Sequence, residues 1–147
     1  RIPETFHINP EVAMKNLALL VLMLCLAACD GDFTMSDVTG KWQLSTMNGQ
    51  PAPATMRAGG VTLEIQEDGK FAGQAPVNRY FGQINAKDKT FKTGPVGMTM
   101  MAGPPELMDA ERDFFAVIND VKSVDVKGGQ LTLTGPDGKQ LVFERAK

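Results

Sequence analysis

The sequence predicts a mainly β domain, built as a small closed or nearly closed antiparallel barrel with one packed helix over about residues 105–121. Two observations carry this prediction. From Lys41 onward, apolar and polar residues alternate with a period of two in short runs, and turn-forming pairs such as Asn-Gly, Asp-Gly and Gly-Gly separate these runs. One segment instead places its apolar residues at helical spacing. Short strands with regular turns are typical of a sheet that closes on itself, because closure removes exposed edges.

Residues 14–28 have the features of a bacterial lipoprotein signal peptide. A short basic start precedes Leu17–Ala28, twelve residues without a charge. This run is too short for a spanning helix, which needs about 20 apolar residues, and it ends in small residues as secretory signals do. Its end, Leu26-Ala27-Ala28-Cys29, resembles the lipobox, which implies cleavage between Ala28 and Cys29 and acylation of Cys29. The alternative is a buried core helix that happens to end in cysteine.

Acyl chains on Cys29 would hold the protein to a membrane, since each buried methylene contributes about 0.8 kcal/mol. We therefore expect a bacterial envelope protein, anchored on the periplasmic side. Asp30 follows Cys29 directly and resembles the signal that keeps enteric lipoproteins in the inner membrane, although the outer membrane stays open. Residues 1–13 do not fit this plan, and we interpret them as an upstream extension of the gene start or a fragment edge. The alternative is that they form an unusually long N-terminal region of the signal peptide itself.

The segment from 29 to 40 is polar and turn-prone, which indicates a tether ahead of a domain over residues 41–147. Trp42 and Leu44 then alternate with polar neighbours in the first expected strand, and Asn48-Gly49 is a turn signal. Residues 50–60 contain two prolines and close with a Gly pair, which is typical of a loop.

The clearest hairpin follows this loop. Val61, Leu63 and Ile65 alternate with polar residues, Asp68-Gly69 turns the chain, and Phe71 lies in the next strand. Further short strands are expected near residues 81–85, 90–93, 96–101, 124–126, 131–134 and 141–143.

The predicted helix starts at Pro104-Pro105, because proline suits a first helical turn. Acidic residues early in the helix suit its dipole. One face of this helix carries Leu107, Ala110, Phe114, Ile118 and Val121. We expect the helix to cover one end of the barrel or to pack on its flank.

Composition excludes several function classes. The 147 residues suffice for one domain, the 43% hydrophobic content excludes a disordered chain, and a net charge of −2 argues against nucleic-acid binding. His7 is the only histidine, and Cys25 and Cys29 are the only cysteines. If residues 1–28 are removed, the mature chain lacks the groups for a His-based triad, a Cys–His pair, a zinc finger or an internal disulfide. We expect no enzymatic activity, no catalytic residues, no metal and no cofactor.

From about residue 38 to 145, the mature chain resembles the META domain, also called the HslJ-like domain. Trp42-Gln43-Leu44 corresponds to the opening W-x-L strand of that family. The central Gly-Cys-Asn-x-Tyr-x-Gly segment corresponds to residues 76–82, with matches at Asn78, Tyr80 and Gly82. A Thr-x-Met-Ala-Cys segment precedes the family's helix, and here Thr99 and Met100 open the corresponding segment.

The chain departs from the family pattern at both family cysteines, which are replaced by Val77 and Gly103. The resemblance implies that these cysteines pair in other members, since both are lost together. We therefore expect the two backbones to lie within disulfide reach, with Cα atoms about 4.4–6.8 Å apart, and Val77 to contribute apolar burial instead.

The resemblance implies an eight-stranded-type, lipocalin-like barrel and stress-linked envelope proteins, heat-shock proteins among them, with no settled catalytic activity. Asn78, Tyr80 and Gly82 then have structural roles: a tight turn, an apolar ring with a polar tip, and a bend. Two functions remain: a membrane-anchored accessory module that binds an envelope protein or peptide, and a small-ligand carrier that uses the barrel mouth. We expect a monomer.

The expected barrel interior favours the protein-binding module, because large residues would fill it. An interior cavity of several hundred Å³ would favour the carrier. The large residues at inward positions are Trp42, Leu44, Val61, Leu63, Ile65, Phe71, Leu131, Leu133 and Phe143.

Two side-chain clusters have less specific interpretations. Met98, Met100, Met101 and Met108 could supply thioether ligands for Cu(I), but no mature histidine or cysteine joins them, and methionine also fills irregular cores. We interpret them as core residues. Three acidic residues crowd the helix without a calcium-loop pattern, and we interpret them as a solvated face. They are Asp109, Glu111 and Asp113.

Overall fold

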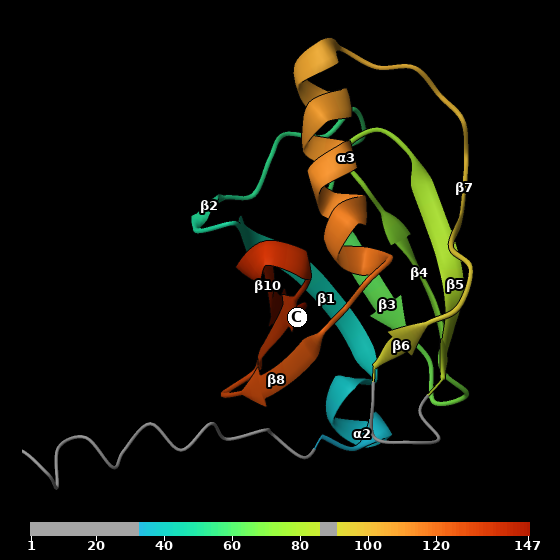
Figure 1. The fold of residues 1–147 in the computed structure, drawn as a ribbon, viewed down its shortest axis with the longest axis vertical. Coiled ribbons are helices and arrows are strands. Elements are labelled where there is room, and N and C mark those ends of the chain that lie inside the picture. The colour runs from blue at the N-terminus through green and yellow to red at the C-terminus, as the bar shows by residue number, and fades with distance from the viewer. Residues whose placement is uncertain (1–32, 86–90) are drawn as a thin grey trace, which may run out of the picture.

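The computed structural model describes residues 33–85 and 91–147. Its strands form a ten-stranded sheet that curls into a half-barrel, and one long helix, α3 (Pro105–Ile118), runs along the open side (Figure 1). The mainly β, nearly closed antiparallel fold with one helix is therefore confirmed. Cys25, Cys29 and the predicted signal peptide lie outside the described residues.

The strands follow the order β6-β5-β4-β3-β1-β10-β9-β8, with β2 paired to β1 and β7 paired to β5. Every pairing is antiparallel. The strands are β1 (Gly40–Met47), β2 (Gln50–Pro51), β3 (Thr62–Ile65), β4 (Lys70–Gln74), β5 (Arg79–Asn85), β6 (Lys92–Thr93), β7 (Gly97–Met98), β8 (Ser123–Lys127), β9 (Gln130–Thr134) and β10 (Gln140–Arg145). The remaining elements are α2 (Met35–Val38) and the 3-10 turn η1 (Pro136–Gly138).

The alternation in the sequence predicts the inward face of the sheet correctly. Val61, Leu63 and Ile65 are buried, whereas Glu64 between them is exposed. The turn at Asn48-Gly49 has positive φ at both residues, 52° and 76°. This conformation matches the right-handed twist of a hairpin, and asparagine and glycine adopt it most readily.

Aromatic rings fill the space between the sheet and α3. Tyr80 of β5 meets Phe114 and Phe115 of α3 edge-to-face, with ring centroids 5.3 and 5.6 Å apart, and Phe71 of β4 meets Tyr80 from the other side at 6.2 Å. Edge-to-face contacts at these distances are favourable for aromatic pairs. The helix is thus held to the sheet by its C-terminal half.

Helix α3 ends at Ile118, three residues before the predicted end at 121. Asn119 and Asp120 form a turn, and the backbone N–H of Lys122 already donates to Thr134 O of β9. Val121 still packs against the core, so its apolar character reflects burial after the helix rather than helical spacing.

The predicted tether over residues 29–40 is wrong for its last residues. Val38, at the end of α2, is fully buried, and its carbonyl accepts a 2.7 Å hydrogen bond from Trp42 Nε1. Arg145 donates to the carbonyls of Asp37 and Thr39 and lies 4.3 Å above the Trp42 ring. The domain therefore begins before residue 41. A helix of four residues depends on such tertiary contacts, so local sequence signals do not predict it.

No helix within residues 33–85 and 91–147 has the length and hydropathy needed to cross a membrane.

Candidate functional site

A buried polar cluster lies where the family-like segment meets α3. Glu111 is 4% exposed, and its Oε2 accepts hydrogen bonds from the backbone N–H groups of Val77 and Asn78, both at 2.7 Å. Its Oε1 accepts from Asn78 Nδ2 at 2.6 Å. These short bonds to a carboxylate are the strong, charge-assisted kind. They fix the turn before β5 to the middle of the helix.

Asn78 extends this cluster to the segment that leads into α3. Its Oδ1 accepts from Thr99 Oγ1 at 2.9 Å and from the backbone N–H of Met101 at 2.7 Å, and its Nδ2 also donates to Met101 O at 3.2 Å. The Thr99 hydroxyl in turn accepts from the backbone N–H of Arg79 at 3.1 Å. Asn78 therefore determines the path of residues 99–101.

The burial of Glu111 corrects the interpretation of the three helix acids as a solvated face. Asp109 is exposed and pairs with Arg112 at 2.9 Å, and the half-exposed Asp113 pairs with Lys139 at 3.1 Å. Glu111 instead follows Leu107 by four positions, which places it on the apolar face of the helix. That spacing is the signal that could have identified it.

The other matched positions have structural contacts. Tyr80 is buried and donates from its hydroxyl to Thr62 O at 2.7 Å, and burial raises the pKa of Tyr80 far above its ordinary value. At Gly82, an added Cβ would lie 2.5 Å from the Phe71 ring, which leaves no room for a side chain. Met100 differs from these, because it is 96% exposed.

Val77 and Gly103, which stand at the family's cysteine positions, are neighbours. A Cβ added at Gly103 would lie 2.8 Å from Val77 Cγ2. One further C–C bond, about 1.5 Å, places the two Cβ positions at most about 4.3 Å apart, within the range of a disulfide. The two positions are therefore neighbours, as the expected pairing requires, and Val77 is fully buried.

Replacing both Val77 and Gly103 with cysteine should produce a disulfide. The chain-entropy model gives a gain of about 3 kcal/mol for a loop of about 26 residues. The closest other neighbour of the new side chain is the flexible Met56, whose Sδ lies 2.9 Å from the added Cβ. Thermal unfolding with and without reductant measures the gain, with each single cysteine variant as the control. Two free thiols in the oxidised double variant would contradict the geometry.

The interpretation of the methionine cluster as core residues is wrong. Within the described part of the chain, all large hydrophobic side chains that are exposed belong to one set, which we call the methionine surface. Its members are Met56, Phe81, Met98, Met100, Met101 and Met108. Two of them, Met100 and Met101, lie in the segment that follows the two-residue strand β7, where Asn78 fixes the backbone while the side chains remain outside the core.

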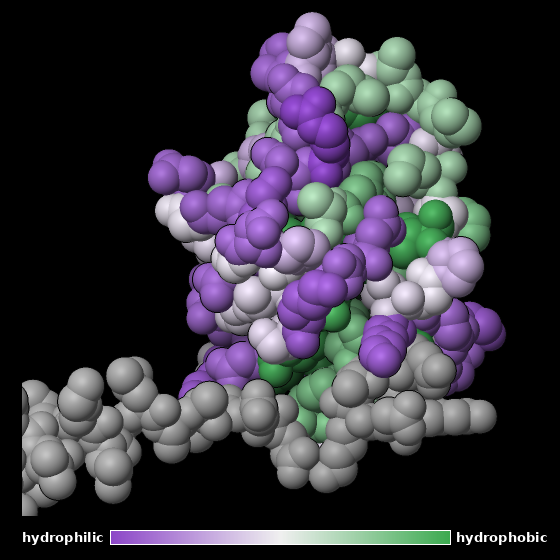
Figure 2. Space-filling view, viewed as in Figure 1, coloured by the Kyte–Doolittle hydropathy of each residue, from purple (hydrophilic) through white to green (hydrophobic). Residues whose placement is uncertain are grey.

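Contacts with neighbouring residues position two members of the methionine surface. The Phe81 ring covers Gly97, its partner in β7, where an added Cβ would lie 2.5 Å from the ring, whereas Met98 pairs with Tyr80. Arg57 Nη2 lies 3.7 Å from Met101 Sδ. Figure 2 shows hydrophobic residues gathered on this side of the molecule, over the segment between β7 and the start of α3.

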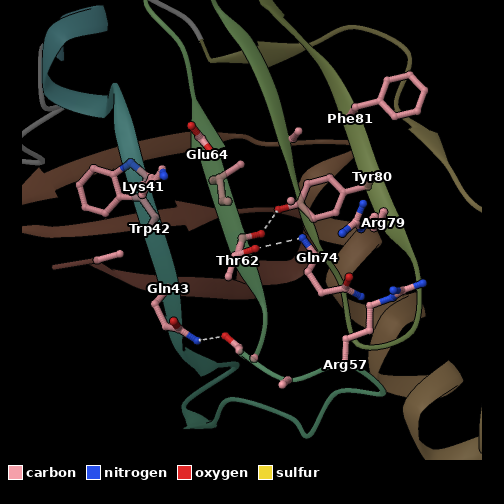
Figure 3. A pocket seen from close by; sticks show the side chains of 17 residues that line it. Lys41, Trp42, Gln43, Arg57, Thr62, Glu64, Gln74, Arg79, Tyr80 and Phe81 are labelled. Atoms are coloured by element: carbon pink, nitrogen blue, oxygen red, sulfur yellow. Dashed lines mark hydrogen bonds between the residues drawn. The ribbon is translucent and has the colours of Figure 1, made fainter.

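A groove of about 750 Å³ adjoins the methionine surface. It lies on the outward face of β1, β3, β4 and β5, and the loop from Arg57 to Gly60 borders it (Figure 3). Three cationic side chains and one acid line it: Lys41, Arg57, Arg79 and Glu64. No ion pair joins these three cations to a carboxylate of residues 33–85 or 91–147. Phe81 belongs to both the groove and the methionine surface.

The groove is separate from the barrel interior, where all nine expected inward residues are buried. The hollow therefore faces away from the core and is not the interior cavity that would favour a carrier. Among the described residues, no group of three His, Cys, Asp or Glu side chains is arranged to hold a metal ion.

Comparisons with known proteins agree with this fold. Two proteins solved by NMR match the chain: one is 20% identical with a TM-score of 0.61, covering 76% of this chain and 94% of its own. The other, from Burkholderia xenovorans, is 18% identical with a TM-score of 0.59, covering 100% of this chain and 98% of its own. No match was found among curated proteins. The META domain family model matches residues 34–147, so the chain belongs to the META domain family.

Proposed function

We propose that this protein is a non-enzymatic, membrane-anchored accessory lipoprotein that binds envelope proteins through the methionine surface and the adjoining groove. The observation that carries the proposal is the composition of that surface: five methionines and one phenylalanine, all exposed, beside a cationic groove. Methionine is flexible and polarizable, and it is common on surfaces that adapt to several partners. Exposed apolar patches typically mark interaction sites.

The position of the anchor relative to the methionine surface favours a protein partner over a lipid surface. Helix α2 lies at the end of the domain opposite the start of α3, near which the methionine surface gathers (Figure 1). Met35 follows Cys29 by six residues, which span at most about 22 Å. A lipid on Cys29 would thus hold the α2 end near the periplasmic face of the membrane, and the methionine surface would face away from it.

The groove's charge indicates the chemistry of the partner. Three cations against one acid give a net charge of +2, beside the exposed ring of Phe81. Complementary charge favours correct partners and excludes like-charged ones. The partner we propose is an extended protein segment that carries carboxylates next to apolar side chains. The stress association of the family suggests that such a segment becomes exposed in stressed envelope proteins.

A small-ligand carrier is the second candidate, and the groove's volume favours it, because about 750 Å³ lies within the usual range for ligand pockets. Its position on an outward sheet face, outside the filled interior, favours an extended segment instead.

A labelled ten-residue peptide of alternating Leu and Asp tests the proposal. The mature domain should bind it at least about tenfold more tightly than a Leu–Lys peptide, a difference of about 1.4 kcal/mol. Phe81→Ser should weaken binding by a similar factor. Lys127→Ser, an exposed position on β8, is the control and should not. Fluorescence anisotropy measures all four affinities. Equal binding of the two peptides, or an unaffected Phe81→Ser variant, would contradict the proposed site.

The anchor has its own test. Cys29→Ser should abolish acylation and release the protein from the membrane fraction, because the lipid supplies the membrane affinity. Metabolic labelling with a fatty acid, followed by fractionation, measures both effects. A variant that remains labelled would show that Cys29 is not the lipid site.

A further inference from the structure

The apolar part of the methionine surface consists almost entirely of thioethers. The chain has nine methionines. Of those in the described ranges, five are exposed, while Met35 and Met47 pack against the core. Among residues 33–85 and 91–147, no leucine, isoleucine or valine joins the exposed set. Leucine would supply similar apolar area. Besides its flexibility, methionine adds a sulfur atom that oxidants can reach.

We propose that the methionine surface is a reversible oxidation site that controls the binding proposed above, on which this inference rests. A hydroperoxide is the oxidant. The thioether sulfur attacks the outer peroxide oxygen, an S–O bond forms and the O–O bond breaks. The sulfur loses two electrons to become a sulfoxide, and the peroxide is reduced to water or an alcohol. A dithiol-dependent reductase reverses the step, since two thiols become a disulfide and the sulfoxide oxygen leaves as water.

Exposure determines which sulfurs react. Met100 is 96% exposed, and the other four exposed methionines lie between 38% and 45%. Met35 and Met47 are partly buried against the core, which makes them internal controls. Each sulfoxide replaces an apolar group with a polar one, so oxidation would leave Phe81 as the one large apolar member of the surface.

Oxidation of Met101 would also change the charge that the groove presents to a ligand. Arg57 Nη2 lies 3.7 Å from Met101 Sδ, and Arg57 is one of the groove's three cations. A thioether is a weak acceptor, whereas a sulfoxide oxygen is a strong one. The sulfoxide of Met101 would therefore hold the Arg57 guanidinium by a hydrogen bond and withdraw it from an acidic ligand. Apolar contact and charge complementarity would fall together.

The experiment treats the mature domain with hydrogen peroxide and follows three readouts. Peptide mass spectrometry should find Met100 oxidised first and Met35 and Met47 last. Retention on a phenyl matrix should fall, and affinity for the Leu–Asp peptide should fall at least about tenfold. Treatment with a methionine sulfoxide reductase should restore both. A variant with leucine at positions 56, 98, 100, 101 and 108 should keep retention and peptide binding after peroxide, because Leu and Met have similar volumes.

Three results would overturn the inference: oxidation of Met35 and Met47 as fast as Met100, unchanged retention after near-complete oxidation of the five, or equal peroxide sensitivity in the five-leucine variant. Failure of the proposed function looks different, because the unoxidised domain would then not bind the Leu–Asp peptide. In that case mass spectrometry and phenyl retention still decide whether the surface is oxidation-controlled. Arg57→Gln should reduce the effect of oxidation on peptide affinity but not on phenyl retention, which isolates the contribution of Met101.

Discussion

Glu111→Ala should lower the free energy of unfolding by about 3–5 kcal/mol, because it removes the acceptor of three buried hydrogen bonds. The donors of these bonds are the backbone N–H groups of Val77 and Asn78 and the Asn78 side-chain amide, of which only the amide keeps another acceptor, Met101 O. A chemical denaturation curve measures the loss. Glu106→Ala in the exposed first turn of α3 is the matched control, and it should cost less than about 1 kcal/mol.

Glu111→Gln refines this test. Its amide oxygen can still accept from the two backbone N–H groups, but its NH₂ would face Asn78 Nδ2, which is also a donor. Asn78 cannot turn its oxygen toward Glu111 without losing the bonds to Thr99 and Met101. The glutamine variant should therefore lie between the wild type and Glu111→Ala. A loss below about 1 kcal/mol in both variants would show that the buried cluster does not stabilise the fold.

Phe114→Ala should cost about 3–5 kcal/mol, the usual range for removing a phenylalanine from a core. Its ring is fully buried and packs against both Tyr80 and Phe115, with centroids 5.3 and 5.4 Å away. The cavity would remove apolar packing between α3 and the sheet.

Phe81→Ala is the matched control for Phe114→Ala, since the Phe81 ring is 61% exposed. Exposed substitutions usually change stability by less than about 0.5 kcal/mol. Thermal unfolding should thus show a large loss of stability for Phe114→Ala and a small one for Phe81→Ala. A strongly destabilised Phe81→Ala variant would mean that this ring supports the fold rather than a partner.

The sequence predicts the strands well because their signal is local. Alternation at Val61, Leu63 and Ile65 requires only that one side of a strand is buried. Local patterns do not predict the end of α3 or the helix α2, because contacts with residues distant in the sequence determine them. Trp42 and Arg145, for example, hold the residues of α2 that the sequence assigns to a tether.

The candidate site could be predicted only in part. The pairing of Val77 with Gly103 follows from the family's cysteines, and the structure places them together. The sequence does not predict the burial of Glu111, because an acidic side chain on a helix ordinarily faces solvent. The sequence does not predict the methionine surface, because apolar residues are ordinarily assigned to the core. The groove collects side chains from four strands and a loop, so only the folded sheet brings them together.

We propose that this protein meets its partner at the methionine surface. Site-specific photo-crosslinking in cells tests it most directly, with a benzophenone amino acid at position 100 of the full, anchored chain and the same group at position 127 as the control. Residue 100 is 96% exposed and lies on the methionine surface, whereas residue 127 is exposed on β8. We predict adducts with envelope proteins at position 100 that are lost with Phe81→Ser, and few at position 127. Equal adducts at both positions, or adducts at position 100 with lipid alone, would contradict the account.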